Sequence, residues 1–147
     1  MLKLSRLTDY AVVALSHLWL SAPQQKTTSE LAQETGLPEP TLAKILKRLA
    51  RENMVQSRRG IGGGYFVEPD MGPRVTIRQI IEMMEGPIAL TTCIEDAPKS
   101  ECSIASLCPV QGRWSGVNKA VIDVLDNVTL ADMQDQVYSL EKRVTHG

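Results

Sequence analysis

Residues 41–67 read TLAKILKRLARENMVQSRRGIGGGYFV, and this stretch decides the fold class. Apolar side chains recur at helical spacing in its first part, which predicts a helix opened by Thr41. The apolar positions are Leu42, Ile45, Leu46 and Leu49. Short strands are expected over 54–57 and 65–67, on either side of a glycine-rich turn at 60–64. The stretch therefore predicts one helix followed by a β-hairpin.

Further helices are predicted on both sides of this stretch. Thr27 and Glu30 form a capping-box pattern, and Gly36 fits the position just past a helix C-terminus. The turn 37–40 joins this helix to the one at Thr41, which is the helix-turn-helix pattern. A longer helix over 8–21 carries an apolar stripe at Leu7, Ala11, Ala14, Leu15 and Leu18. We expect a mainly α fold with a small β-hairpin, namely a winged helix-turn-helix domain over 1–87 followed by a long C-terminal dimerisation helix.

The charge of the chain is unevenly distributed. The formal net charge is −1, but residues 1–75 hold ten Lys and Arg against seven Asp and Glu, a charge of +3. In the window 44–59 the only acid is Glu52, and the cations are Lys44, Lys47, Arg48, Arg51, Arg58 and Arg59. A local basic patch of this kind is the electrostatic footprint of a DNA-reading protein. A merely solvated helix face remains open as an alternative.

The basic residues of the predicted helix recur at steps of three and four, away from the apolar stripe. Thr41 can bond a phosphate or a base edge, and the arginines at the root of the turn can reach a neighbouring groove. The candidate DNA contacts are Thr41, Lys44, Lys47, Arg48, Arg58, Arg59, Gly62 and Gly63. A plain tight hairpin is the alternative role for the glycines. A nucleotide-binding loop is rejected, because no Gly-Lys-Ser/Thr sequence and no helix follow.

All the cysteines of the chain, Cys93, Cys102 and Cys108, fall in the loop-like segment 88–110. The chain start lacks signal-peptide features and no apolar run is long enough for a membrane span, so we expect a cytoplasmic protein with reduced thiols. Clustered thiols there suggest an iron–sulfur or soft-metal site, or a redox switch. Zinc is disfavoured because no Cys-x-x-Cys pair occurs, whereas a disulfide switch without metal stays open.

The segment 111–147 carries an apolar stripe at alternating steps of three and four residues. The stripe comprises Trp114, Val117, Val121, Val124 and Val128, and the spacing resumes at Leu130, Met133, Val137, Leu140 and Val144. A stripe on a helix that follows a complete small domain must be buried, either within its own chain or against a second copy. Because winged helices commonly read two-fold sites as dimers, we expect a homodimer on double-stranded DNA.

These motifs together resemble one family of winged-helix regulators. Residues 7–12 (LTDYAV) resemble its N-terminal signature, 58–65 (RRGIGGGY) its wing, and 127–132 (NVTLAD) the segment after its long helix. The cysteines lie where that family carries cluster ligands. It is the Rrf family of iron–sulfur regulators that includes IscR, NsrR and RirA, and the branch regulating iron–sulfur cluster assembly is the most similar. The resemblance implies a dimer on a pseudo-palindromic promoter site, controlled by a bound [2Fe–2S] or [4Fe–4S] cluster.

The resemblance also predicts the cluster ligands, which are the three cysteines and one further group. The first gap between cysteines is longer than in IscR-like members, and Gln111 stands where those members place a histidine ligand. NsrR-like members use an aspartate of the other subunit, which makes Asp9 the candidate fourth ligand. Helix capping or interaction with the helix dipole is the ordinary role of such an early aspartate. The other candidates are a water, a small thiol, Glu95, Asp96 and Glu101.

We therefore expect a DNA-binding transcriptional regulator whose promoter binding is controlled by an iron–sulfur cluster, acting on genes of cluster assembly or iron homeostasis. The alternative is a metal-free cysteine redox switch, or a nitric-oxide-responsive regulator, on the same scaffold. An enzyme is not expected. The sequence contains no Ser-His-Asp set, no supported Cys–His pair and no paired carboxylates at a recognisable pocket.

Overall fold

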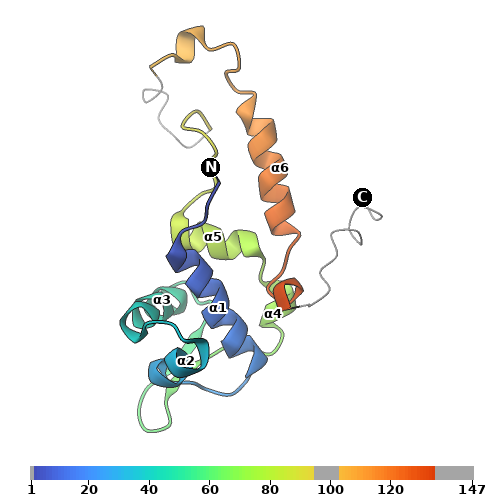
Figure 1. Ribbon diagram of the computed structural model, residues 1–147. Coiled ribbons are helices and arrows are strands. Elements are labelled where there is room, and N and C mark those ends of the chain that lie inside the picture. Colours follow the sequence, from blue (N-terminus) through green and yellow to red (C-terminus); the bar gives the residue numbers. More distant parts are fainter. Residues whose placement is uncertain (1, 95–102, 135–147) are drawn as a thin grey trace.

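The computed structural model of this 147-residue chain describes residues 2–94 and 103–134. Within these residues the elements are α1 (Arg6–Leu20), α2 (Thr28–Thr35), α3 (Glu39–Arg51), β1 (Gln56–Arg58), β2 (Gly64–Phe66), α4 (Met71–Arg74), α5 (Ile77–Glu85), η2 (Ala105–Leu107), α6 (Trp114–Asp126) and η3 (Asp132–Gln134). The predicted fold class is confirmed, because a mainly helical chain carries one antiparallel hairpin and a long C-terminal helix (Figure 1). None of the helices in these ranges has both the length and the hydropathy that a membrane span requires.

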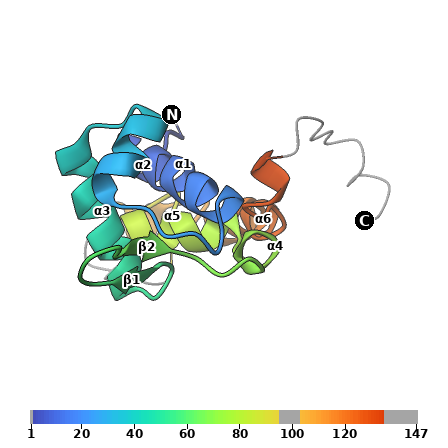
Figure 2. The same ribbon diagram turned by 90° about the horizontal axis from the view of Figure 1, so that it is seen from below.

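α1 lies among the other helices of the N-terminal part and contacts α2, α3, α4, α5 and β2 (Figure 2). Its stripe is buried at Ala11, Ala14, Leu15 and Leu18. The facing side chains of α3 are Leu42, Ile45, Leu46 and Leu49, and those of α5 are Ile77, Ile80, Ile81 and Met84. One continuous core therefore supports both the helix-turn-helix and the hairpin.

α1 begins at Arg6, earlier than the predicted start at Thr8. Ser5 is its N-cap, since the Ser5 hydroxyl accepts a hydrogen bond of 3.2 Å from the Thr8 amide. One position of the predicted stripe is wrong, because Leu7 is 47% exposed and the buried residue of this turn is Thr8. Thr8 tolerates burial because its hydroxyl donates to the Glu85 carboxylate at 2.5 Å.

The predicted helix-turn-helix is present. The Thr27 amide donates to Glu30 Oε2 at 2.7 Å and the Glu30 amide donates to Thr27 Oγ1 at 3.1 Å, which completes the capping box of α2. α2 ends, as predicted, at a left-handed glycine. α3 begins at Glu39 rather than at Thr41. Pro40 fits the first helical turn because no intrahelical bond needs its missing N–H there.

The hairpin is displaced from the prediction, since β1 spans Gln56–Arg58 instead of 54–57 and β2 spans Gly64–Phe66 instead of 65–67, and it is fixed on both sides. β1 starts after residue 55 because the Met54 amide still bonds to the Leu49 carbonyl of α3, at 2.9 Å. β2 pairs with β1 on one edge. On its other edge, Lys26 and Tyr65 exchange backbone hydrogen bonds of 2.9 and 2.8 Å. The connection between α1 and α2 therefore lies directly beside the wing.

α5 is delimited by signals that are visible in the sequence. Thr76 and Gln79 form its capping box, with hydrogen bonds of 2.9 and 3.3 Å. Gly86 follows its last turn with a φ of 88°, a conformation that favours glycine. The chain leaves α5 at this glycine and enters the segment that carries the cysteines.

α6 extends away from the winged-helix part, and η2 lies beyond its N-terminal end (Figure 1). After α6 the chain returns to the domain. The Ile77 amide donates to the Val128 carbonyl at 2.8 Å, and the Leu130 amide donates to the Val75 carbonyl at 2.9 Å. Leu130 is fully buried in the core. The C-terminal end of α6 is thus attached to the winged helix, and its N-terminal end leads to the cysteine segment.

Candidate DNA-binding surface and cysteine loop

α3 presents a basic side to solvent. Lys44, Lys47, Arg48 and Arg51 are all exposed, while Ile45, Leu46 and Leu49 between them are buried. Together with Glu52, these side chains line a shallow groove of about 410 Å³. The helical spacing therefore places the four predicted cations on one face.

Within residues 2–94 and 103–134, the cations of this face have no counter-ion. The ion pairs among the described residues are Lys26–Glu34, Arg74–Asp70, Arg78–Glu82, Arg78–Asp126 and Lys119–Asp123. None of these pairs involves a cation of α3 or an arginine of the wing. A group of unpaired cations on one surface creates a positive potential that attracts a polyanion such as DNA.

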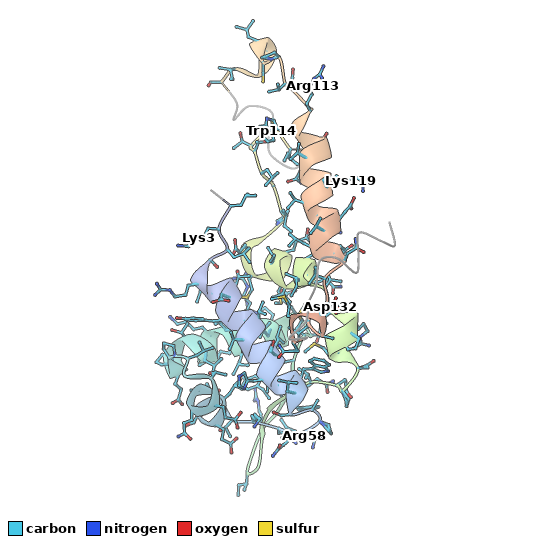
Figure 3. All side chains as sticks on the ribbon, turned by 45° about the vertical axis from the view of Figure 1, so that its right-hand side comes forward. Lys3, Arg58, Arg113, Trp114, Lys119 and Asp132 are labelled. Carbon is cyan, nitrogen blue, oxygen red and sulfur yellow. The ribbon has the colours of Figure 1, made fainter. Side chains whose placement is uncertain are left out.

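The wing adds two arginines to the basic surface. Arg58 lies at the hairpin, at the opposite end of the molecule from Trp114 (Figure 3). Its guanidinium stands over the Phe66 ring, 5.3 Å from the centroid, whereas Arg59, which is exposed like Arg58, contacts no ring in the described part of the chain. Gln25, from the connection between α1 and α2, also contacts the wing. No local pattern in the sequence marks Gln25, because this contact joins residues that are distant in the chain.

The other predicted DNA contacts lie near these arginines and lysines. Thr41 is half-buried inside the first turn of α3. Gly63 has a structural reason to lack a side chain, because a Cβ there would collide with the Arg58 carbonyl. Gly62 has a φ of 75° and open space around it. The tight turn alone therefore accounts for part of the glycine pattern, and contact of these glycines with DNA stays a prediction.

Two of the three cysteines lie in the described residues. Cys93 is exposed, with its sulfur 3.2 Å from the Thr91 hydroxyl, and Cys108 is half-buried after η2; both are free thiols. Outside the described residues lie Cys102, Glu95, Asp96 and Glu101. Within 2–94 and 103–134, no three potential metal ligands gather. The donor chemistry fits an iron–sulfur cluster, because both thiols are soft ligands free of a disulfide, and their assembly with Cys102 stays a prediction.

Asp9 is exposed in the first turn of α1, where Ser5 performs the capping that an early aspartate often supplies. Its neighbour Thr8 and the Ser5 amide both donate to Glu85 Oε1, at 2.5 and 2.7 Å. These hydrogen bonds, that of Thr8 first, hold the pKa of Glu85 below its ordinary value. They attach the start of α1, with Asp9, to the end of α5, from which the chain leads to Cys93.

A buried polar side chain of α6 contacts the segment before the cysteines. Asn118 is 5% exposed, its Nδ2 donates to the Ile88 carbonyl at 2.9 Å, and its Oδ1 accepts from the Leu90 amide at 3.0 Å. A buried amide bonded at both ends fixes one register between the two segments. Asn118 therefore joins α6 to the chain that leads to Cys93, and no motif in the sequence marks it.

Comparison with known proteins gives the family. The family model Rrf2, described as an iron-dependent transcriptional regulator, matches residues 4–136. This chain belongs to the Rrf2 family. Among curated relatives, the HTH-type transcriptional repressor NsrR of Streptomyces coelicolor is 28% identical over 134 residues, which cover 90% of this chain and 88% of that protein.

Solved structures of Rrf2-family regulators share the fold. CymR, described as the global cysteine regulator of B. subtilis, matches with a TM-score of 0.67 and 29% identity, covering 92% of this chain and all of that one. IscR of T. potens matches with a TM-score of 0.63 and 28% identity, covering 90% and 85% of the two chains. The family predicted from the motifs is therefore confirmed. Because these relatives are named transcriptional regulators, the chain is a DNA-binding transcriptional regulator rather than an enzyme.

Proposed function

We propose that this Rrf2-family protein reads a pseudo-palindromic promoter as a homodimer, and that an iron–sulfur cluster controls the binding. The DNA-reading part is 1–87, the cluster-binding loop is 88–110, and the dimerisation part is 111–147. The controlled genes are those of cluster assembly or iron homeostasis. The observation that carries the proposal is the basic side of α3, whose cations have no counter-ion among the described residues.

Removal of one cation tests the DNA-reading part. Lys44→Ala should lower the slope of log affinity against log salt by about one unit, because one phosphate contact and its released counter-ion are lost. Lys119→Ala is the matched control, since its ammonium already bonds Asp123 at 2.7 Å, and its slope should equal that of the wild type. The duplex is one that the wild-type protein selects from a random-sequence pool. An unchanged slope for Lys44→Ala would show that Lys44 does not contact a phosphate, against the proposed role of this side of α3.

Cys93, Cys102 and Cys108 would hold the cluster, with Asp9 of the partner subunit as the fourth ligand. Thiolates are the usual ligands of such clusters, and [2Fe–2S] and [4Fe–4S] forms are both compatible with this donor set. When bound, the cluster would supply iron that reacts with the signal. An oxygen ligand from a carboxylate binds iron less firmly than a thiolate does, which suits a sensor of iron supply or oxidative damage.

The chain offers a route from the loop to the DNA-reading part. Asn118 bonds the backbone at Ile88 and Leu90, and the far end of α6 leads into the buried Leu130. If cluster binding ordered the cysteine segment, the free energy of the contact between Asn118 and the backbone at Ile88 and Leu90 would change. The position of α6 would change with it. In a dimer held together by α6, that placement sets the distance between the two α3 helices.

Anaerobic preparation tests the cluster. Mössbauer spectroscopy and native mass spectrometry of the wild type should detect iron with inorganic sulfide. Cys102→Ser should abolish the visible absorbance and change the affinity for DNA or the choice of site. Asp9→Ala should make the cluster more labile, whereas Asp123→Ala, an exposed carboxylate on α6, should not. A colourless wild type, or a colourless Cys102→Ser with unaltered DNA binding, would contradict the proposal.

The homodimer is supported by the exposed apolar side of α6. Trp114, Val117 and Val124 are 41%, 49% and 61% exposed. An apolar groove of about 540 Å³ lies beside α6, with Val121 of the same stripe and Leu125 in its wall. Contiguous apolar surface on a small protein marks an interaction site. A second copy presents the same stripe, so the two helices would bury each other around a two-fold axis.

A metal-free cysteine redox switch is the second candidate. The exposed free thiol of Cys93 and the similarity to a global cysteine regulator favour it. Two thiols suffice for a reversible disulfide. Protein that stays colourless after anaerobic reconstitution with iron and sulfide, and whose DNA affinity follows reversible thiol oxidation, would select this candidate over the cluster.

A further inference from the structure

The turn of the wing has unusual backbone freedom, yet it is held in one shape. Gly60 and Gly62 have φ values of 97° and 75°, and the Gly63 amide donates to the Gly60 carbonyl at 3.0 Å. A glycine-rich loop that was free in solution would lose much conformational entropy when it bound a groove. Contacts that hold the loop before binding therefore raise its affinity.

Arg58 makes one of these contacts. It lies opposite Gly64 in the hairpin, and because Gly64 has no side chain, the Arg58 side chain can cross the strand to the diagonal neighbour Phe66. There its guanidinium stands 5.3 Å from the ring centroid, in cation–π geometry. The Arg58 side chain therefore contacts another residue of the same hairpin.

Gln25 completes the arrangement from outside the hairpin. The Gln25 amide oxygen and nitrogen are assigned from the hydrogen bonds that they can make: in the orientation that satisfies both, the oxygen accepts from Arg58 Nη1 at 3.0 Å and the nitrogen donates to the Gly62 carbonyl at 3.1 Å. Two backbone hydrogen bonds join the adjacent Lys26 to Tyr65 of β2. They keep the backbone beside Gln25 next to the wing. One side chain therefore connects the first strand of the wing to the turn.

Arg59 differs from its neighbour. Both arginines are exposed, but among the described residues no ion pair, hydrogen bond or ring contact involves the Arg59 side chain. We propose that Gln25 and Arg58 are positioning residues that hold the wing in its DNA-binding shape, and that Arg59 is the wing arginine that touches DNA. This proposal rests on the DNA-reading role given above to the wing.

Salt dependence separates the two arginines. With the full-length protein and the selected duplex, Arg59→Ala should lower the salt slope by about one unit. Arg58→Ala and Gln25→Ala should weaken binding about three- to tenfold, the effect of a lost hydrogen bond, with the salt slope unchanged. Gln24→Ala, an exposed neighbour, is the control and should bind like the wild type. Loss of a full unit of slope in Arg58→Ala, or wild-type affinity in Gln25→Ala, would overturn the proposal.

Lysine substitutions give a second, charge-conserving test. Lysine keeps the positive charge but has neither the planar fork nor the stacking surface of arginine. Arg59→Lys should restore the wild-type salt slope and most of the affinity. Arg58→Lys should bind as weakly as Arg58→Ala, because its role depends on geometry. Full recovery by Arg58→Lys would show that charge alone acts there, against the proposal.

A measurement without DNA keeps this proposal separate from the proposed function. Hydrogen exchange of the amides in 60–64 should be faster in Gln25→Ala and Arg58→Ala than in the wild type. It should be unchanged in Arg59→Ala and Gln24→Ala. Equal exchange rates of these amides in all variants would show that Gln25 and Arg58 do not position the wing. If the wild type selects no duplex at all, the DNA-reading function fails, whereas the exchange result still decides whether Gln25 holds the wing.

Discussion

The Thr8 hydroxyl at the start of α1 donates a hydrogen bond of 2.5 Å to the Glu85 carboxylate at the end of α5. The Ser5 amide donates to the same oxygen at 2.7 Å. Thr8 is fully buried, so the bond is shielded from competing water on one side. It attaches the turn that carries the candidate ligand Asp9 to the point where the chain departs toward Cys93.

Replacing Thr8 tests how much this attachment stabilises the fold. Thr8→Val keeps the shape of the side chain but removes the donor, and should lower the free energy of unfolding by about 1–2 kcal/mol. Thr8→Ser keeps the donor and should cost less. Urea denaturation followed by circular dichroism measures both variants. Wild-type stability in Thr8→Val would mean that the Glu85 carboxylate is satisfied by water instead.

Glu85 should make the stability depend on pH in a defined direction. The Thr8 hydroxyl and then the Ser5 amide lower the pKa of Glu85 in the folded chain. A carboxyl with a depressed folded pKa stabilises the fold above its unfolded pKa, and this contribution is lost as the pH falls through the folded pKa. The stability difference between the wild type and Glu85→Gln should therefore be largest near neutral pH and should shrink in the acid range. A difference that is constant from pH 7 to pH 3 would contradict this assignment.

Asn118 should contribute to the stability of the fold, although it is a polar residue on an apolar side of α6. Asn118→Ala leaves the Ile88 carbonyl and the Leu90 amide without their partner, which should cost about 1–3 kcal/mol. Asn127→Ala is the matched control, because Asn127 is an exposed asparagine at the C-terminal end of α6, and it should cost less. Chemical denaturation gives the stabilities, and faster hydrogen exchange at Leu90 should accompany only Asn118→Ala. Equal losses for the two asparagines would show that Asn118 does not fix α6.

In the cluster-bound protein, Asn118→Ala also tests the proposed coupling between the cysteine loop and DNA binding. Asn118→Ala should keep the visible absorbance of the wild type, because no proposed ligand is altered. The ratio of DNA affinities with and without the cluster should move toward one. A ratio equal to that of the wild type would mean that the loop signals to DNA by another route.

The winged helix is predictable from the sequence because local signals specify it. The capping boxes at Thr27 and Thr76 involve residues a single turn apart, and the apolar spacing of α3 sets its buried side without help from the rest of the chain. The boundary errors at α1, α3 and β1 amount to one or two residues and arise from local capping and turn contacts, whereas the error in burial occurs where a distant residue intervenes. Leu7 fits the apolar stripe of α1, yet the adjacent Thr8 occupies the buried position because Glu85 provides its hydrogen-bond partner.

The candidate site is predictable in its composition but not in its connections. Helical periodicity alone places the cations of α3 on one side. The bridge from Gln25 to Arg58 and the contact of Asn118 with the chain before Cys93 are tertiary, and no pattern of neighbouring residues encodes them. The ligand set stays a prediction, since Cys102 lies outside the described residues and Asp9 would act from the partner subunit.

The exposed stripe of α6 gives a direct test of the homodimer. Val124 is 61% exposed on this stripe, and Val124→Lys should place a charge in the proposed interface and shift the protein from dimer to monomer. Asp123→Lys introduces the same residue at the adjacent position on the other side of α6. This substitution removes an exposed ion pair with Lys119, which contributes little to stability. The Asp123→Lys protein should therefore remain dimeric. Sedimentation velocity over a range of concentrations measures both. Because two linked α3 helices bind a two-fold site together, Val124→Lys should also lose affinity for the full site while keeping that for a half-site. A dimeric Val124→Lys with intact binding would require an interface away from α6.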